Sequence, residues 1–295
     1  MQLRLSNAES RQKRVLAVHD ISCVGRCSLT VALPVLSAMG FETSILPTSI
    51  LSTHTGGFTG YTYRDLVADM NPIVDHWKGL GLCFDAIFSG WLGTHHHIQR
   101  MQRLLDVFSG NHPFVMIDPV MGDNGRLYAT LDQDYVNAMR QYCARAQILL
   151  PNLTEAALLT ETPYPASGYD RAYIEDMLKR LCDSGAEIAV LTGVSLSPGR
   201  IGAAAYCRAD GDFCYCDSQF IPGCWHGAGD VFASALLGAC LWGQPVNAAL
   251  KTAVDFTARC IRRTQAAGTD ERLGLQFEPE LTRLACLAGK NENLK

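Results

Sequence analysis

The chain has 295 residues, of which 48% are hydrophobic and 18% are charged, and its formal net charge is −4. This is the composition of an ordinary globular protein with a sizeable apolar core. The weakly negative charge argues against nucleic acid or an anionic membrane as a partner, so small molecules are the expected ligands.

The twelve cysteines are scattered along the chain, and no paired CxxC spacing indicates a zinc site. Most lie in apolar stretches, where a free cysteine behaves as a small hydrophobic residue. The N-terminal segment has no apolar region of the kind found in secretory signals, and no apolar run approaches the length of about 18 residues that a membrane span needs. We therefore expect a cytoplasmic protein with reduced thiols.

Short apolar runs alternate with helical patterns along much of the chain. The predicted strands cover residues 15–19, 41–46, 84–88, 113–117, 147–150 and 188–192. The predicted helices cover residues 28–39, 64–80, 96–108, 131–144, 153–160 and 171–184. Pro72 is expected to interrupt the second of these helices. The alternation predicts a three-layer α/β/α fold, with a mostly parallel central sheet and helices on both faces.

The pattern changes in the last third of the chain. Residues 200–207 and 212–218 flank an Ala-Asp-Gly turn and predict a β-hairpin. Helices are expected over residues 228–242 and 246–261.

Neither a linker nor a repeat divides the sequence, so one domain is the simplest organisation. We expect this domain to span residues 14–288. The polar residues 1–13 would form a flexible N-terminal extension, and residues 289–295 would form a frayed tail.

Six polar or glycine-rich segments are expected at the same edge of the sheet. They are residues 20–27, 48–63, 89–94, 118–125, 151–155 and 227–230. Ligands of open α/β sheets bind beyond the carboxyl ends of the strands, so these segments together predict a binding site.

The last of these segments contains Gly227, Ala228, Gly229 and Asp230, followed by an apolar helix. Such a turn directs backbone N–H groups to one point in front of a positive helix end, which suits phosphate. Asp230 beside that point suggests a general base next to a transferring phosphoryl group. The alternative is a tight turn whose acid only favours the start of the helix.

Three ordered motifs give the chain a resemblance to the ribokinase-like superfamily. They are Asp-Pro-Val-Met-Gly at 118–122, Pro-Asn-Leu-Thr-Glu at 151–155 and Gly-Ala-Gly-Asp at 227–230. More narrowly, the chain resembles the vitamin B6 (pyridoxal, pyridoxine and pyridoxamine) kinases and the related hydroxymethylpyrimidine kinases. The segments that match the pyridoxal kinase pattern are 18–25, 48–55 and 89–93. The resemblance extends over residues 15–287.

The resemblance implies ATP-dependent phosphorylation of the 5′-hydroxymethyl group of a B6 vitamer, in the salvage of pyridoxal 5′-phosphate. Asp230 would take the proton from this group. The N–H groups of Gly227, Ala228 and Gly229 would hold the oxygens of the transferring phosphate.

The resemblance also assigns ATP and its metal ion to a second group of residues. Asp118 and Glu155 would lie near the ATP phosphates and hold Mg²⁺ largely through water, while Asn152, Thr192 and Gly229 would contact ATP. Asn152 and Glu155 can equally be a helix N-cap and a first-turn acid, and the two roles are compatible. At Thr192 one branch of the B6 kinases is expected to carry Lys, so the role of this residue is open.

For the vitamer ring, the resemblance implies contacts with Asp20, Thr48, His54 and Trp91. Asp20 would pair with a protonated ring nitrogen or with the amine of pyridoxamine; the alternative is an acid that caps the following turn. Trp91 is either an apolar wall near the ring or a rim aromatic. Residues 56–63 would form a mobile flap that excludes water.

Two further segments of the sequence contain histidine. Consecutive histidines do not share a helix face, so His95, His96 and His97 are expected at a surface helix start rather than around a metal ion. His226 stands where some hydroxymethylpyrimidine-kinase-like enzymes carry Cys, which argues mildly against the thiamin-pathway activity.

Two other functions remain open from the sequence. One is a hydroxymethylpyrimidine kinase, and the other is a B6-binding carrier on the same fold. The resemblance implies a homodimer, whereas the preferred vitamer and assistance by K⁺ are not decided by the residues.

Overall fold

The computed structural model describes residues 11–165 and 168–292. Most of the strands join one sheet: β1 (Arg14–Val24), β2 (Glu42–Thr53), β3 (Tyr63–Asp65), β4 (Ala86–Ser89), β5 (Phe114–Ile117), β8 (Ile148–Leu149), β9 (Ile188–Val194), β10 (Arg200–Cys207) and β11 (Phe213–Gln219). A separate small hairpin consists of β6 (Gly122–Asp123) and β7 (Arg126–Leu127).

The large sheet has the strand order β11-β10-β9-β8-β5-β4-β1-β2-β3. From β2 to β9 all neighbouring strands run parallel. The strands at the edges, β3 on one side and β10 with β11 on the other, are antiparallel. The predicted mostly parallel sheet is therefore confirmed.

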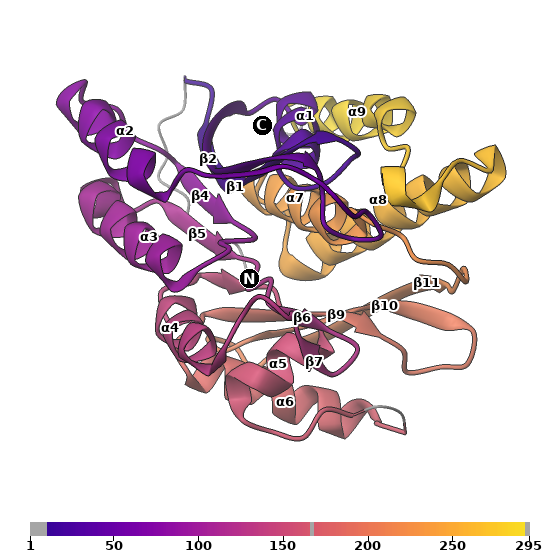
Figure 1. Cartoon of the computed structure of the whole chain (residues 1–295). Helices are drawn as coiled ribbons and strands as arrows, with labels where there is room; N and C mark the ends of the chain where they lie inside the picture. The colour runs from indigo at the N-terminus through magenta and orange to yellow at the C-terminus, as the bar shows by residue number, and fades with distance from the viewer. Residues whose placement is uncertain (1–10, 166–167, 293–295) are drawn as a thin grey trace.

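Helices cover both faces of the sheet (Figure 1). The longer helices are α1 (Leu29–Ala38), α2 (Val67–Gly79), α3 (His95–Phe108), α4 (Gln133–Cys143), α5 (Leu153–Thr160), α6 (Arg171–Asp183), α7 (Ala228–Leu241), α8 (Val246–Ala267) and α9 (Leu281–Glu292). Single 3₁₀ turns are η1 (Ser109–Asn111), η2 (Glu271–Leu273) and η3 (Glu278–Glu280).

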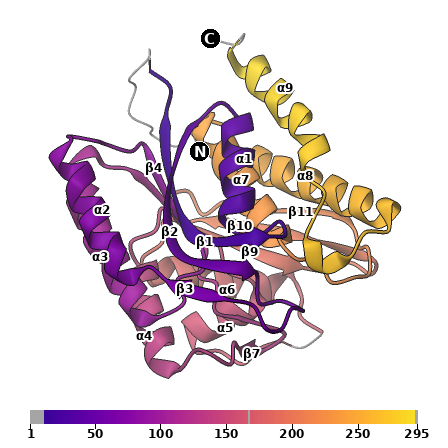
Figure 2. The same ribbon diagram turned by 45° about the horizontal axis from the view of Figure 1, so that its top comes forward.

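Two hydrophobic cores result, one on each face of the sheet. Helices α1, α7 and α8 pack on one core and α2 to α6 on the other, and Figure 2 shows the sheet between the two layers. Alternate residues of β1 point into different cores: Val15 and Ala17 into the first, Leu16 and Val18 into the second. The three-layer α/β/α fold predicted from the sequence is confirmed.

The first two strands are longer than predicted, and their extra length is important for the site. β1 continues past His19 to Val24, and β2 continues to Thr53, so the two strands stay paired beyond the rest of the sheet. The register shifts between His19 and Ile21, which is the signature of a bulge. The expected loops that begin at residues 20 and 48 are therefore partly strand.

Three other features differ from what the sequence predicts. Pro72 lies inside α2 without interrupting it. Pro72 has no N–H to donate to the carbonyl oxygen of Ala68, so α2 lacks that hydrogen bond but continues on both sides of the proline. Helix α9 and the β6–β7 hairpin were not expected from the sequence.

The two predicted terminal segments are described only in part. Residues 1–10 and 293–295 lie outside the described residues, while Arg11 forms an ion pair with Asp85. Helix α9 continues to Glu292. Within the described ranges, no helix is long and apolar enough to cross a membrane.

Candidate active site

The turn before α7 requires glycine at its first position. Gly227 is the N-cap of α7 and has φ 75° and ψ 0°, in the left-handed region that L side chains rarely adopt. A Cβ atom at this position would also collide with the carbonyl oxygen of Arg26. Gly227 therefore allows the chain to turn tightly against the β1–α1 connection and to enter α7.

The backbone N–H groups of this turn differ in their availability. The Ala228 N–H donates to the carbonyl oxygen of Trp225 at 3.2 Å. The N–H groups of Gly227, Gly229 and Asp230 have no acceptor within hydrogen-bond distance among the described residues. A Cβ atom at Gly229 would meet open space, so this side of the turn can be approached by a ligand. The free donors thus include Asp230, whereas the N–H of Ala228 is already used.

The carboxylate of Asp230 is held on one side only. Its Oδ2 accepts the Ser28 N–H at 2.9 Å and lies 3.5 Å from the thiol sulfur of Cys27. Its Oδ1 lies 4.0 Å from Nδ1 of His19 and accepts no hydrogen bond from the described residues. Burial, reinforced by the nearby charge of Asp20, raises the pKa of Asp230 to about 6. One oxygen therefore remains available to accept a proton.

Asp20 lies within β1 and not in a turn, so the alternative role as a turn cap is wrong. Its side chain is buried, and its two oxygens accept the hydroxyl groups of Ser28 at 2.5 Å and Ser22 at 3.3 Å. Burial raises the pKa of the Asp20 carboxyl, and these hydroxyl groups oppose that rise.

Asn152 and Glu155 form a capping box at the start of α5. The Asn152 side chain accepts the Glu155 N–H at 2.9 Å, and the Glu155 carboxylate accepts the Asn152 N–H at 2.8 Å. The Asn152 amide also donates to the carbonyl oxygen of Gly122, and the second Glu155 oxygen accepts the Met121 N–H at 3.1 Å. The predicted capping role is confirmed, and it leaves the Asn152 side chain occupied by protein contacts.

Asp118 follows β5 and accepts no hydrogen bond from the described residues. Burial raises the pKa of Asp118, and the charges of Glu155 and Asp230 raise it further. Buried carboxylates that repel one another suit a hard divalent cation. The described residues contain no group of three His, Cys, Asp or Glu side chains able to hold a metal. The donor set therefore fits Mg²⁺ that keeps water and substrate phosphates as its other ligands.

Thr192 lies beside the capping box. Its N–H donates to the carbonyl oxygen of Pro151 at 3.0 Å, and it forms a parallel bridge with Asn152. Asp123 is exposed and accepts the Asn124 N–H in the turn of the β6–β7 hairpin.

Thr48 connects β2 to two neighbouring elements. Its carbonyl oxygen accepts Nε2–H of His97 at 3.0 Å, and its hydroxyl donates to the carbonyl oxygen of Trp91 at 3.4 Å. The Trp91 ring contacts Tyr63 edge to face, with centroids 6.4 Å apart. His97 is fully buried, so the predicted surface position of the three histidines is wrong for this residue. Its ring faces inward because Thr48 supplies an acceptor there.

His54 is buried and uses both ring nitrogens within the protein. Nε2–H donates to the carbonyl oxygen of Arg272 in η2 at 2.5 Å, and Nδ1 accepts the Gly56 N–H at 3.1 Å. Its ring centroid lies 4.9 Å from that of His226, and the Arg272 guanidinium lies over the ring of Phe58. These contacts attach the start of the predicted flap to the C-terminal part of the chain.

Several residues near this site were not identified by sequence reasoning. They are His19, Cys27, Ser28 and Arg272. His19 ended a predicted strand and was assigned to the core, where it is indeed buried; burial lowers its pKa to about 3. Ser28 has φ 55° and ψ −126°, a conformation that no sequence signal indicates for serine.

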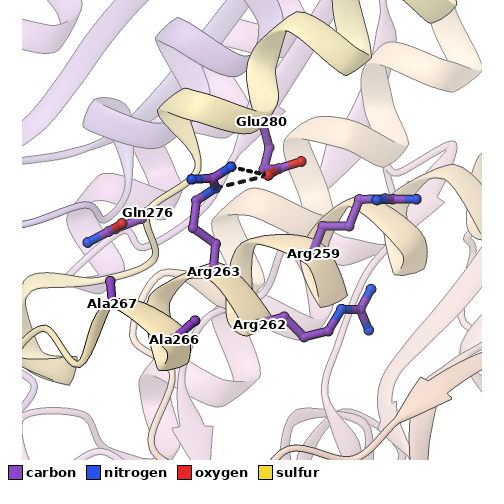
Figure 3. A pocket seen from close by; sticks show the side chains of 7 residues that line it. All are labelled: Arg259, Arg262, Arg263, Ala266, Ala267, Gln276 and Glu280. Atoms are coloured by element: carbon purple, nitrogen blue, oxygen red, sulfur yellow. Dashed lines mark hydrogen bonds and ion pairs between the residues drawn. The ribbon is translucent and has the colours of Figure 1, made fainter.

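A separate pocket of about 500 Å³ lies beside α8 (Figure 3). Its lining residues are Arg259, Arg262, Arg263, Ala266, Ala267, Gln276 and Glu280. Arg263 forms an ion pair with the buried Glu280 at 2.9 Å. None of the lining residues belongs to the predicted site.

Comparisons with known proteins identify the family and similar structures. The family model described as phosphomethylpyrimidine kinase matches residues 80–273. A putative phosphomethylpyrimidine kinase of Bacteroides thetaiotaomicron, crystallised with pyridoxal, is 36% identical with a TM-score of 0.88, over 93% of this chain and 96% of that chain. The pyridoxal kinase of Lactobacillus plantarum is 34% identical with a TM-score of 0.86, over 95% and 99% of the two chains.

A relative of lower sequence identity is also a B6-vitamer kinase by name. The pyridoxine/pyridoxal/pyridoxamine kinase of Bordetella pertussis is 26% identical over 273 residues, which are 88% of this chain and 92% of the relative. The fold and these matches thus define a ribokinase-like protein. More specifically, the chain belongs to the phosphomethylpyrimidine kinase family, and within that fold it is similar to pyridoxal kinases.

Proposed function

We propose that the protein is a pyridoxal kinase that transfers the γ-phosphoryl group of ATP to the 5′-hydroxymethyl group of a B6 vitamer. The observation that carries this proposal is the pairing of free N–H groups at Gly229 and Asp230 with an open carboxylate oxygen on Asp230. Phosphoryl transfer needs charge stabilisation and positioning, together with a group that accepts the proton of the attacking hydroxyl. The similarity to pyridoxal kinases supports the choice of substrate.

In this proposal Asp230 is the general base. Its Oδ2 is fixed by Ser28, and its Oδ1 takes the proton of the substrate hydroxyl. Its raised pKa, about 6, leaves it mostly ionised at pH 7 while making it a better proton acceptor than an exposed aspartate. The N–H groups of Gly227, Gly229 and Asp230 stabilise the charge on the phosphate oxygens, with the Asp230 N–H taking the place expected of the Ala228 N–H.

Asp118 is the open oxygen ligand for Mg²⁺ in this proposal, and Glu155 acts through water because both its oxygens accept backbone N–H groups. Bound Mg²⁺ would neutralise charge on the phosphates of ATP. In this proposal ATP lies against Thr192 and the backbone at Asn152, next to the Mg²⁺ site.

At the other end we assign the vitamer ring to a pocket between Asp20, Thr48 and Trp91. Here His54 acts by attaching the flap rather than by a ring nitrogen, since both of its nitrogens are already bonded. We also propose a homodimer, on the basis of the resemblance, and a cytoplasmic location, on the basis of the many cysteines in apolar stretches.

Two other functions are alternatives to this proposal, and the phosphorylation assay described below distinguishes them from it. A hydroxymethylpyrimidine kinase has the fold and the phosphate-binding turn in common with this proposal, and the family description names phosphomethylpyrimidine. A carrier on the same fold would need no base. The Asp20 and Thr48–His54 segments favour the B6 vitamers.

The test is a steady-state phosphorylation assay with Mg·ATP and pyridoxal, pyridoxine, pyridoxamine or hydroxymethylpyrimidine, in buffers with Na⁺ or K⁺ and in chelator. We expect kcat/KM at least tenfold higher for one of the vitamers than for hydroxymethylpyrimidine, and loss of turnover in chelator. The reverse ranking would assign the pyrimidine activity. Binding of pyridoxal without turnover of any of the four compounds would identify a carrier.

A further inference from the structure

Ser28 connects two acids that are far apart in the sequence. Its N–H donates to Asp230 Oδ2 at 2.9 Å, and its hydroxyl donates to Asp20 Oδ1 at 2.5 Å. Asp230 lies in the first turn of α7, Asp20 lies in β1, and Ser28 is the N-cap of α1. A single residue thus contacts the proposed base and an acid of the proposed ring pocket.

The backbone of Ser28 is in an unfavourable conformation. Its φ of 55° and ψ of −126° lie where a residue with a Cβ atom is rarely found. Such a conformation persists only where the surrounding contacts impose it. Here Ser28 forms an antiparallel bridge with Ile21 and caps α1 through its carbonyl oxygen, which accepts the Ala32 N–H. Its buried hydroxyl is fixed mainly by the short bond to Asp20, and it also lies 3.7 Å from the sulfur of Cys27.

The orientation of the N–H follows from this conformation. If φ relaxed to a negative value, the peptide unit that carries the N–H would rotate relative to α1, and the bond to Asp230 would be lost. Asp230 would then retain only the weak contact with the Cys27 thiol. The hydroxyl of Ser28 therefore acts on Asp230 through the backbone and not by touching it.

We propose that Ser28 is a positioning residue for Asp230, whose strained backbone is locked by the hydrogen bond to Asp20 so that its N–H orients the Asp230 carboxylate. The proposal rests on the proposed function, in which Asp230 is the base. It gives Asp20 a second role, because Asp20 accepts the bond that holds Ser28 in place.

Two variants of Ser28 separate the parts of this arrangement. Ser28→Ala removes the hydroxyl and keeps a Cβ atom that disfavours positive φ, so the backbone should relax. Ser28→Gly also removes the hydroxyl, but glycine adopts positive φ freely and can keep the N–H in place. Ser234→Ala is the control, because Ser234 is equally buried and its hydroxyl has no partner among the described residues.

We expect Ser28→Ala and Ser28→Gly to lower kcat by different amounts. Ser28→Ala should lower kcat at least about tenfold, with KM for ATP changed less than about threefold, and Ser28→Gly should lower kcat less than about threefold. The N–H bond favours the ionised carboxylate, so the acid limb of kcat/KM should move up by about one pH unit in Ser28→Ala only. Unchanged kcat and acid limb in Ser28→Ala, or equal losses in both variants, would overturn the proposal.

A second measurement does not depend on activity. The carboxyl carbon of Asp230 can be titrated by ¹³C NMR in the wild type, in Ser28→Ala and in Ser28→Gly. The other titratable groups that face Asp230 are His19, Asp20, Cys27 and Asp118. Asp20→Asn in the Ser28→Ala background controls for the direct charge of Asp20.

The expected NMR result is a higher pKa of Asp230 in Ser28→Ala and a nearly unchanged one in Ser28→Gly. Adding Asp20→Asn to Ser28→Ala should lower the pKa of Asp230 only by the loss of the Asp20 charge. A pKa of Asp230 that is equal in all three proteins would refute the role of Ser28. If the wild type phosphorylated none of the vitamers, the proposed function would fail, while this titration would still decide whether Ser28 orients Asp230.

Discussion

The two ends of the candidate site use their polar groups in opposite ways. At the phosphate end, which we define as Gly227, Gly229, Asp230 and Asp118, the N–H groups of the first three residues, one oxygen of Asp230 and the carboxylate of Asp118 have no hydrogen-bond partner among the described residues. At the ring end, defined as Asp20, Thr48, His54 and Trp91, nearly every polar group is already bonded to the protein.

The difference indicates which property each end controls. Free groups at the phosphate end can bond to charge that develops during transfer, so changes there should reduce kcat. Groups at the ring end are held in place by the protein without a ligand and form a preorganised binding surface. Changes there should therefore alter KM, substrate ranking and stability. The following predictions test this division, beginning with the largest expected effect.

Asp230→Asn should lower kcat by about 10³-fold, within the range of about 10²–10⁴ for loss of a general base. KM for the vitamer should change less than about threefold, because the amide keeps the size and the contacts of the side chain. Steady-state kinetics measure both values.

The control is Asp134→Asn, since Asp134 is an exposed acid in the first turn of α4 and tests the effect of the helix dipole alone. It should leave kcat within about twofold. If Asp230→Asn retained more than a tenth of wild-type kcat, Asp230 would not be the base, and the contrast between the two ends would be lost.

Gly227→Ala should lower kcat about 10²-fold and destabilise the protein by about 1–3 kcal/mol. The added Cβ atom meets both a positive φ of 75° and the carbonyl oxygen of Arg26, so the turn and its N–H groups must move. Kinetics and denaturant unfolding give the two values.

Gly243→Ala is a matched control beyond the other end of α7. Gly243 has φ 85° and would place a Cβ atom in open space, so it carries the backbone strain without the collision. We expect a comparable loss of stability with kcat nearly unchanged. A similar loss of kcat in both variants would show that strain, rather than the position of the N–H groups, is responsible.

The pH dependence should also come from the phosphate end. The base acts when ionised, and its pKa is raised to about 6 mainly by burial, so activity should be lost as the pH falls through this value. Below it, kcat/KM should fall about tenfold per pH unit. A pH profile of the wild type shows this limb, and an unchanged rate down to pH 5 would contradict it.

Much of the fold follows from the sequence because its elements carry local signals. Helix α5 has the predicted bounds, since Asn152 and Glu155 supply a capping box where the helix begins. Strand β10 also has the predicted bounds, next to a recognisable turn. The sequence does not predict the pairing of β1 with β2 beyond His19, because the apolar run that indicates β1 ends there and the register shifts at a bulge.

The site could be predicted only in part, because some of its contacts join residues that are far apart in the sequence. Gly227 and Asp230 are adjacent in sequence, so one motif indicates both the turn and the acid. Ser28 contacts Asp20 and Asp230 across the fold, and its positive φ at a residue other than glycine has no local signal. Likewise the bond from His54 to Arg272 joins residues 218 apart along the chain, which only the three-dimensional structure brings together.

The smallest expected effect belongs to the ring end, and Asp20→Ala separates two roles of this acid. If Asp20 pairs with a ring nitrogen or an amine, KM for pyridoxamine should rise about fivefold more than KM for pyridoxine, since loss of one charged hydrogen bond costs about 1 kcal/mol or more. If Asp20 acts only by holding Ser28, kcat should fall equally for every vitamer and KM should not change. Rates on the three vitamers distinguish these outcomes. A uniform loss of kcat would move Asp20 from the ring end to the support of Asp230, and the boundary between the two ends would then run between Asp20 and Thr48.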